Sequence, residues 1–447
     1  MSERFVGRLL ITTLLGVAGI VRSADFQPVQ INFDSGPTAM KGFVSLKDSA
    51  NYSDARGYGF EPFSSSQFVT YPGNPTHAIL TSDRSMYFSA KVPEGNYRVT
   101  VWAGDAEADT AMAIKAESRR IVTSFVKVPR GEVKPVEFVV NVRTDKIAGG
   151  GGVKISDRER APNVRHWDDK LTLEFVGKHP AINAIKIEKA DDLTTVFLVG
   201  DSTVTDQPGE PWAAWGQLIP QYFGPKVAVA NYAESGRTFR SFKGDRRWEK
   251  VLSVIKPGDS VFMQFGHNDM KEKGDGVGPY TTFTESIRQF VADTRAKQAN
   301  PVLLTPMHRR KFAGGEIQPT FGDYPDAVRK AAAELNVPLI DLQAMSKPLF
   351  EAYGPEKSKK LFVYAPAGTY PGQEKALSDD THFNAFGADL IARCVVQGIK
   401  DLKLPLAADL KDGIPAFDPT KPVDPATFEI PESRPPATQK TVVPEGR

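Results

Sequence analysis

The chain has 447 residues, of which 40% are hydrophobic and 25% are charged, a composition typical of globular proteins and a length that predicts more than one domain. Its 56 basic and 54 acidic side chains give a formal net charge of +2, so no bulk positive field would draw the chain onto nucleic acid. The single cysteine, Cys394, excludes an internal disulfide and a thiolate zinc site, and the apolar periodicity around it predicts a buried side chain without a chemical role.

The first 24 residues are predicted to be a cleaved signal peptide. Arg4 and Arg8 precede an apolar run over residues 9–21, and the small residues Ser23 and Ala24 follow it. The apolar run is shorter than the roughly 18 to 20 residues that span a bilayer. The sequence therefore predicts a secreted or periplasmic protein without a stable membrane anchor.

Residues 25–190 are predicted to form a β-sandwich domain. Apolar and polar residues alternate in several segments, which are separated by glycine, proline and aspartate clusters and have no convincing helix between them. The clearest of these segments are residues 97–101, 136–142, 171–175 and 185–187. Each predicts a strand with one buried face, and such strands pack as two facing sheets.

From residue 193 the pattern changes to an alternation of strands and helices, which predicts a three-layer α/β/α domain with a parallel sheet over residues 193–404. The predicted strands cover residues 196–199, 227–230, 261–265, 302–304 and 337–340, and the predicted helices cover residues 211–223, 246–255, 283–299, 327–335 and 384–402. Residues 405–447 are rich in proline and are predicted to wrap the surface or to remain loose. In an open parallel sheet the active site lies at the carboxyl ends of the strands.

A serine follows the first strand of this predicted sheet. Ser202 stands in the block Gly200-Asp201-Ser202-Thr203, where the apolar strand ends. A serine at such a turn can present its hydroxyl at the sheet edge beside backbone N–H groups, although a serine that caps a turn or a helix is commoner. The G-x-S-x-G pattern of α/β-hydrolases is absent from the sequence, which argues against that fold.

An aspartate and a histidine precede the last predicted helix. Among the six histidines, only His382 has an aspartate, Asp379, three residues before it. This carboxylate could orient the imidazole so that His382 deprotonates Ser202, while a chance pairing in a surface loop is the alternative. Asp380 competes for the same role, and the spacing favours Asp379.

Two further polar groups follow the next two predicted strands. Gly236 stands in the block formed by residues 231–237, and Asn268 stands in Gly-His-Asn-Asp at residues 266–269. The backbone amides of Ser202 and Gly236 and the side-chain amide of Asn268 would supply three donors to an oxyanion. A turn glycine and a helix-capping asparagine are the alternatives.

The order of these blocks along the chain resembles the SGNH (GDSL-type) hydrolase family over about residues 193–402. Residues 200–203, 231–238 and 380–384 are most similar to the corresponding blocks of rhamnogalacturonan acetylesterases. Some enzymes of this kind carry an N-terminal β-domain that resembles galactose-binding jelly rolls. The resemblance implies a serine esterase in which Ser202, Asp379 and His382 form the triad, and Ser202, Gly236 and Asn268 form the oxyanion hole.

Basic residues near the predicted site favour an acidic substrate. Arginine forks suit carboxylates and aromatic faces suit sugar rings, although a solvated basic surface is the alternative. The candidate substrate-binding residues are Arg237, Arg309 and Arg310, and the candidate pocket-lining residues are His267 and Tyr324. The basic residues that follow Gly236 alternate with the aromatic residues Phe239, Phe242 and Trp248. No H-E-x-x-H occurs and the histidines are dispersed, so no metal or other cofactor is expected.

Together with these observations, the resemblance implies a secreted carbohydrate esterase that removes O-acetyl groups from a plant cell-wall polysaccharide, with acetylated rhamnogalacturonan of pectin as the expected substrate. Its expected partner is this acidic polysaccharide, with no nucleic acid and no obligate protein partner. A lipase or thioesterase on the same scaffold is one alternative, and it would have a longer apolar groove. A catalytically inactive glycan-binding protein is the other alternative, favoured if the triad geometry fails.

Overall fold

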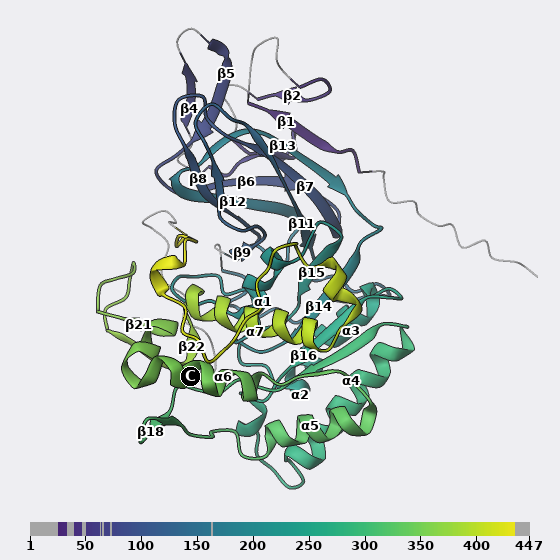
Figure 1. Cartoon of the computed structure of the whole chain (residues 1–447). Coiled ribbons are helices and arrows are strands. Elements are labelled where there is room, and N and C mark those ends of the chain that lie inside the picture. Colours follow the sequence, from purple (N-terminus) through teal and green to yellow (C-terminus); the bar gives the residue numbers. More distant parts are fainter. Residues whose placement is uncertain are drawn as a thin grey trace, which may run out of the picture.

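The computed structural model describes residues 26–33, 40–46, 51–62, 64, 67–71, 74–161 and 164–433, so the predicted signal peptide lies outside the described residues. Figure 1 shows two units, one above the other: an N-terminal β-rich unit and an α/β unit that contains the later strands and the helices. None of the helices in these ranges combines the length and the apolar character that crossing a membrane requires.

The N-terminal unit consists of two facing, mainly antiparallel sheets. The first sheet contains β1 (Val29–Asn32), β2 (Val44–Ser45), β4 (Gln67–Tyr71), β5 (Asn74–Thr81), β7 (Gly95–Ala103), β11 (Lys134–Val142) and β13 (Ala181–Lys189), and the second contains β3 (Tyr58–Phe60), β6 (Met86–Lys91), β8 (Thr110–Ala116), β9 (Arg120–Ile121), β10 (Val126–Val128) and β12 (Lys170–His179). Alternate residues of β7, Tyr97, Val99 and Val101, are buried in one core with Leu171 and Leu173 of β12. The period-two pattern thus buries one face of each sheet, and the predicted β-sandwich is confirmed.

The second unit is built on a parallel sheet with the strand order β15-β14-β16-β17-β20. Its strands are β14 (Thr194–Gly200), β15 (Val227–Asn231), β16 (Ser260–Gln264), β17 (Asn300–Leu304) and β20 (Leu339–Ile340). The change from antiparallel to parallel pairing falls between β13 and β14. Residues 190–193 therefore connect the two units.

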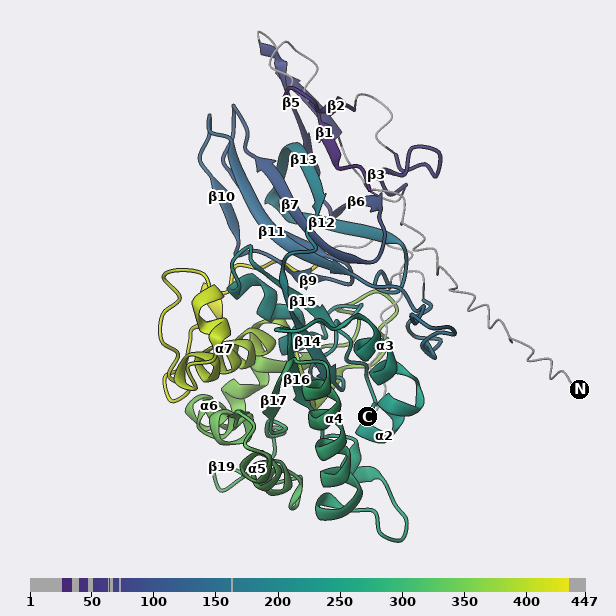
Figure 2. The same cartoon turned by 90° about the vertical axis from the view of Figure 1, so that its right-hand side faces the viewer.

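Helices cover both faces of this sheet. They are α1 (Trp215–Leu218), α2 (Phe239–Gly244), α3 (Arg247–Val254), α4 (Thr284–Ala296), α5 (Tyr324–Leu335), α6 (Leu342–Lys357) and α7 (Ala385–Asp401). On β14, Val196 and Leu198 pack in the core that includes α1, α6 and α7, whereas Phe197 and Val199 pack in the core that includes α2 to α5. Figure 2 shows α6 and α7 on one side of the sheet and α2, α3 and α4 on the other. The predicted three-layer α/β/α architecture is confirmed.

Several elements differ from the sequence-based expectation. Helix α6 was not predicted, because Pro348 and Pro355 are helix breakers, and the backbone kinks at Gly354, where φ is 69°. The strands β21 (Phe362–Ala365) and β22 (Leu377–Phe383) form a small antiparallel sheet where a loop was expected. The predicted helix over residues 211–223 is shorter, because Pro220 follows α1 within a 3-10 turn over residues 219–222.

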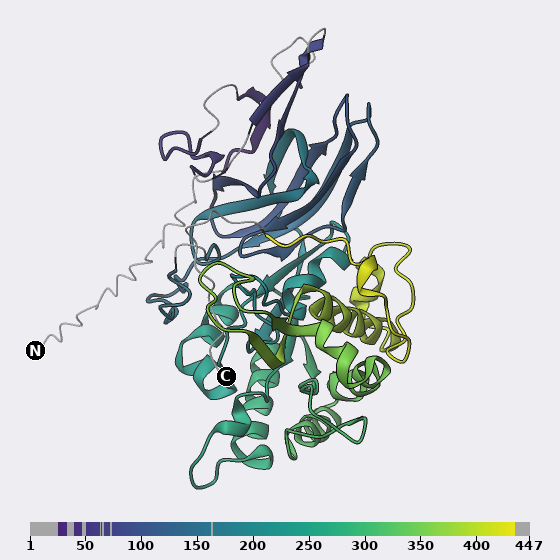
Figure 3. The same ribbon diagram turned by 90° about the vertical axis from the view of Figure 1, so that its left-hand side faces the viewer.

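The remaining short elements are β18 (Phe312–Ala313), β19 (Glu316–Ile317) and the helical turns Asp269–Lys271, Pro279–Phe283, Ser358–Leu361, Pro405–Asp409 and Pro425–Thr427. Residues 405–433 follow α7 and pass to the base of the β-sandwich, as Figure 3 shows in yellow. The hydroxyl of Tyr353 on α6 donates to the carbonyl of Val423 at 2.6 Å, and Lys115 of β8 donates to the carbonyl of Pro431 at 2.9 Å. This part of the proline-rich tail therefore wraps the surface and connects the two units.

Buried charges join the two units at β9, which Figure 1 places directly above α1. Arg120 donates through Nη2 to Asp206 at 2.7 Å, and Arg119 donates through Nη1 to the carbonyls of Gln207 and Trp212 at 3.0 and 2.9 Å. These five residues are all buried. Because Asp206 and Gln207 lie just after Ser202 in the chain, the β-sandwich contacts the loop that carries the predicted nucleophile.

Candidate active site

Ser202 begins the loop that follows β14. At Gly200 an added Cβ would lie 2.5 Å from the carbonyl oxygen of Gln264, so glycine is required where β14 and β16 approach each other. Asp201 accepts hydrogen bonds from the amide and the hydroxyl of Thr203 at 3.0 and 2.8 Å, and burial raises the pKa of Asp201. Gln207 donates through Nε2 to the Ser202 carbonyl at 2.7 Å. These hydrogen bonds fix the main chain around Ser202.

The structure brings Ser202, His382 and Asp379 into one hydrogen-bonded chain. His382 and Asp379 lie on β22, where Nδ1 of His382 is 2.9 Å from Oδ2 of Asp379 and Nε2 is 2.8 Å from the Ser202 hydroxyl oxygen. Although burial opposes its ionisation, hydrogen bonds from the His382 ring and from the amides of Thr381 and His382 hold the pKa of Asp379 well below its usual range. Because an ionised carboxylate only accepts, Nδ1 carries the proton and Nε2 accepts from Ser202.

Asp380 has different partners. Its carboxylate accepts from Nη1 of Arg310 at 2.6 Å and from the hydroxyl of Tyr364, and its carbonyl accepts from the Arg310 amide at 2.8 Å. It is about half exposed, whereas Asp379 is buried. The geometry thus gives Asp379, and not its neighbour, the contact with His382.

Gly236 and Asn268 lie on the loops that follow β15 and β16. Gly236 has φ of 76°, a conformation that favours glycine. Asn268 donates to the carbonyl of Arg237 at 3.4 Å. Asp269 connects the two loops, because its carboxylate accepts from the amides of Phe239 and Gly266, both at 2.9 Å, and burial raises the pKa of Asp269 to about 7.

The three predicted oxyanion donors are therefore held on fixed loops at the carboxyl ends of neighbouring strands. Within the described ranges, the backbone amides of Ser202 and Gly236 donate no hydrogen bond to another group of the chain. Both amides are available to a negatively charged oxygen, as an oxyanion hole requires.

The predicted substrate-binding arginines have different surroundings. Arg237 donates through Nε to Asp245 at 2.6 Å, and Arg310 pairs with Asp380 as described above. Arg309 donates through Nη2 to the carbonyl of His267 at 3.1 Å, and has no acidic partner within the described residues. Arg309 is therefore the arginine of this set whose charge is available to a ligand.

His267 and Tyr324 have packing roles in the structure. Burial and the nearby Arg309 hold the pKa of His267 well below its usual range, and Nε2 of His267 lies 3.3 Å from the Met307 sulfur. The hydroxyl of Tyr324 donates to the carbonyl of Asp269 at 3.2 Å. Tyr324 also lines a cavity of about 280 Å³ between α2 and α4.

The expectation that aromatic residues after Gly236 present their faces to sugar rings is wrong. Phe239, Phe242 and Trp248 are 3%, 0% and 2% exposed and belong to the core beneath the sheet. Trp248 stacks on Phe290 with 4.1 Å between ring centroids. Their spacing, interleaved with basic residues, is the amphipathic pattern of α2 and α3 and not a ligand-binding pattern.

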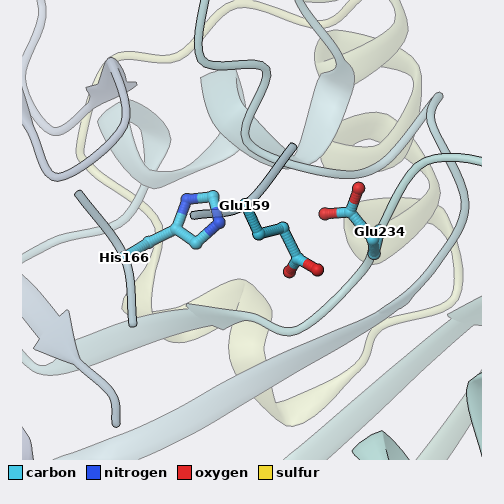
Figure 4. A group of neighbouring side chains, drawn as sticks. All are labelled: Glu159, His166 and Glu234. Carbon is cyan, nitrogen blue, oxygen red and sulfur yellow. The ribbon is translucent and has the colours of Figure 1, made fainter. Parts of the chain in front are cut away.

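Among the described residues, one group of side chains has the composition of a metal site. Glu159, His166 and Glu234 lie together in the interior, with Glu159 between the other two (Figure 4). However, Glu159 pairs with Arg247, which holds the pKa of Glu159 well below its usual range despite burial, and Glu234 pairs with Arg158. Because guanidinium groups already neutralise both carboxylates, the cluster does not fit a cation.

Comparison with known proteins adds an independent observation. The family model of the GDSL-like lipase/acylhydrolase family matches residues 198–390. Rhamnogalacturonan acetylesterase RhgT of Bacillus subtilis (strain 168) is 44% identical over 214 residues, which are 47% of this chain and 91% of that protein. The chain belongs to the GDSL-like lipase/acylhydrolase family. The family expected from the order of the sequence blocks is therefore confirmed, and the chain is a serine esterase.

Two other relatives from the same organism are similar to this member of the family. The probable rhamnogalacturonan acetylesterase YesY is 38% identical over 223 residues, which are 48% of this chain and 96% of that protein. The uncharacterized esterase YxiM is 27% identical over 421 residues, which are 90% of this chain and 98% of that protein. The similarity to YxiM thus extends over both units of the fold.

Proposed function

We propose that this esterase removes O-acetyl groups from a polysaccharide and that its substrate is acetylated rhamnogalacturonan. The observation that carries the proposal is the hydrogen-bonded chain from Ser202 through His382 to Asp379, with distances of 2.8 and 2.9 Å. It lies in a unit whose relatives include rhamnogalacturonan acetylesterases at 44% and 38% identity. The same distances remove the reason for favouring an inactive binding protein. Export of the chain, expected from residues 1–24, is part of the proposal.

In the first half of the reaction, the Ser202 oxygen attacks the acetyl carbonyl carbon while Nε2 of His382 takes the hydroxyl proton. Asp379 stabilises the imidazolium that forms. The carbonyl oxygen becomes an oxyanion and accepts from the amides of Ser202 and Gly236 and from the side chain of Asn268. The C–O bond to the sugar then breaks, and His382 gives its proton to the departing sugar oxygen, which leaves as a hydroxyl group.

In the second half, water replaces the sugar. His382 takes a proton from this water, whose oxygen attacks the acetyl carbon of the acyl-enzyme on Ser202. The same oxyanion donors stabilise the second tetrahedral intermediate. Its collapse breaks the bond to Ser202, the serine oxygen regains the proton from His382, and acetic acid leaves, which ionises to acetate in solution.

Arg309 supports an acidic polysaccharide as the substrate. Its guanidinium is half-buried, and its Nε has no hydrogen-bond partner within the described residues. The guanidinium carbon, Cζ, lies 4.9 Å from the centroid of the Phe321 ring. The pKa of Arg309 is lowered by burial, against the attraction of Asp201 and Asp379. Because Asp201 is next to Ser202 and Asp379 contacts His382, Arg309 lies where a substrate carboxylate near the reacting ester could pair with it.

The proposal is tested by measuring acetate release from acetylated rhamnogalacturonan, acetylated xylan, and p-nitrophenyl esters of increasing chain length. Wild-type protein is expected to prefer the acetylated pectic polymer and the acetyl ester, and Ser202→Ala to lose turnover on both while keeping its fold. A preference for long acyl chains would indicate a lipase. Turnover retained by Ser202→Ala would refute the assigned nucleophile.

The acidic substrate predicts a specific salt dependence. Added salt should weaken activity on acetylated rhamnogalacturonan, because attraction between partly exposed charges is screened within about 10 Å at 0.1 M salt. Activity on p-nitrophenyl acetate should hardly change. Arg309→Gln should likewise raise KM for the polymer and leave KM for the small ester close to wild type. Identical salt responses on the two substrates would contradict the preference for an acidic substrate and would indicate a general acetylesterase.

A further inference from the structure

Between β11 and β12, the described residues 143–161 and 164–169 leave the β-sandwich and lie along the α/β unit. The amide of Lys154 donates to the carbonyl of Asp245 at 2.9 Å, and Arg246 of the α/β unit donates to the carbonyl of Gly150 at 3.1 Å. Glu159 in the same segment pairs with Arg247, the first residue of α3. We call residues 143–161 and 164–169 the bridging segment.

One side chain of the bridging segment reaches both catalytic loops. Arg158 donates through Nε to Oε1 of Glu234 at 3.1 Å, and its Nη2 donates to the same oxygen. Its Nη1 donates to Oε1 of Gln207 at 3.3 Å. The side chains of Arg158 and Glu234 are 6% and 1% exposed, so water competes little for these hydrogen bonds.

Each partner of Arg158 is directly connected to a group of the proposed mechanism. Gln207 accepts from Arg158 with its side-chain oxygen and donates with its side-chain nitrogen to the Ser202 carbonyl at 2.7 Å. Glu234 donates its amide to the carbonyl of Gly200 at 3.1 Å and stands two residues before Gly236. Arg158 thus links the nucleophile loop to the loop that carries the oxyanion glycine.

The positive charge of Arg158 stabilises the buried carboxylate of Glu234. Burial raises the pKa of Glu234 although Arg158 lies against it, and Oε2 of Glu234 has no hydrogen-bond partner within the described residues. Removing the Arg158 guanidinium leaves the buried Glu234 carboxylate without its hydrogen-bonded counter-charge, with only the attraction of Arg247 remaining, and favours protonation of the carboxylate or its movement toward water. In either case the loop that contains Gly236 loses its side-chain connection to Gln207 and the nucleophile loop.

We propose that Arg158, supplied by the bridging segment of the N-terminal unit, is a positioning residue of the active site. It acts through Gln207 and Glu234, holding the Ser202 and Gly236 amides in the relative position that the oxyanion requires. The inference rests on the proposed function, because it assumes that these amides stabilise the reacting oxygen. Its consequence is that the N-terminal unit contributes to kcat and does not serve only as an appended module.

The test compares Arg158→Gln with Arg160→Gln in the full chain. Arg160 lies two residues along the same segment, is about 60% exposed, and pairs only with Asp157 at 3.3 Å among the described residues, so it is a matched control. Initial rates on p-nitrophenyl acetate are divided by the concentration of active sites, counted by titration with an organophosphate. This normalisation separates a misplaced catalytic group from a loss of folded protein.

We expect Arg158→Gln to lower kcat at least ~10-fold with KM close to wild type, since small displacements of oriented groups cost up to about 10²-fold in rate. Arg160→Gln should match wild type. Arg158→Lys should recover part of kcat, because an ammonium restores the charge beside Glu234 but not the forked contact with Gln207. If Arg158→Gln has the kcat of Arg160→Gln, the inference is wrong, whereas a wild-type protein without esterase activity would refute the proposed function instead.

A second variant tests the same path if Arg158→Gln does not fold. Gln207→Met removes the link between Arg158 and the Ser202 carbonyl while leaving the Arg158–Glu234 pair intact. We expect the same pattern of a lower kcat and a nearly unchanged KM. In a folded double variant, the effects of Arg158→Gln and Gln207→Met should be less than additive, since both break one connection. A wild-type kcat for Gln207→Met would overturn the role assigned to this path.

Discussion

Asp379 and Asp380 are neighbours in the sequence, yet their carboxylates have different environments. Asp379 is buried and its two oxygens accept from the ring of His382 and from two backbone amides. Asp380 pairs with Arg310 and Tyr364. This difference gives the two carboxylates different roles, and it can be tested one residue at a time.

Asp379→Asn should lower kcat far more than Asp380→Asn. An asparagine at 379 leaves the imidazole without its counter-charge and favours the wrong tautomer, a change that costs on the order of 10⁴-fold at neutral pH in a triad of this type. Asp380→Asn should change kcat little and weaken only the contacts with Arg310 and Tyr364. The measurement is kcat on p-nitrophenyl acetate. Small, equal losses would instead indicate a Ser–His dyad, and a larger loss at Asp380 would reverse the assignment.

At the scale of single elements, the start of α7 fixes the position of β22, the strand that contains His382. The side-chain oxygen of Asn384 caps α7 by accepting from the backbone amide of Gly387 at 3.0 Å. The backbone amide of Asn384 donates to the carbonyl of Leu361 at 3.2 Å. An added Cβ at Gly387 would lie 1.9 Å from that same carbonyl oxygen. Glycine is therefore required at 387 by close packing and not by its backbone angles.

Gly387→Ala should destabilise the fold by about 1 to 3 kcal/mol, because the new methyl group forces α7 away from Leu361. Since His382 lies just before α7, kcat should fall as well. Gly244→Ala is the control: Gly244 ends α2, and an added Cβ there meets nothing within 4 Å. It should be neutral or stabilise by roughly 0.4 to 1 kcal/mol through the unfolded state. Urea unfolding of both variants measures the difference, and equal stabilities would contradict the packing argument.

At the scale of the whole molecule, buried histidines make stability depend on pH. His308 is buried beside the end of β17, and burial lowers its pKa to about 4. Burial also holds the pKa of His166 and of His267 well below the usual range. Because these pKa values are lower in the folded chain than the usual value of about 6.5, the unfolded chain binds more protons in acid.

The contribution of His308 to stability is therefore complete above about pH 6.5 and decreases as the pH falls toward 4. His308→Gln should retain more of its neutral-pH stability at pH 4.5 than wild type does, because glutamine does not titrate. Urea unfolding at a series of pH values between 7 and 4 measures this slope. The same slope in His308→Gln and wild type would show that His308 does not contribute to acid sensitivity.

Much of this protein could be predicted from the sequence because the relevant patterns are local. Alternating apolar residues predicted the strands of the β-sandwich, and the change of period near residue 193 predicted the parallel sheet. Helix α6 was missed because its prolines are ordinary helix breakers, and tertiary packing outweighed that local preference. The block order along the chain was enough to predict the family and to select Ser202, Asp379 and His382 as candidates.

Which charges meet was decided by the tertiary structure alone. Ser202 and His382 are 180 residues apart, and no local pattern of apolar and polar residues predicts that they lie within hydrogen-bonding distance. The sequence shows Arg237 and Arg309 equally as basic residues near the site, yet folding pairs the first with Asp245 and leaves the second without an acidic partner in the described residues. Likewise, nothing local distinguishes Arg158 from Arg160. Ion pairs of this kind form between segments that only the packing of the two units brings together, and burial then determines how strongly each charge acts.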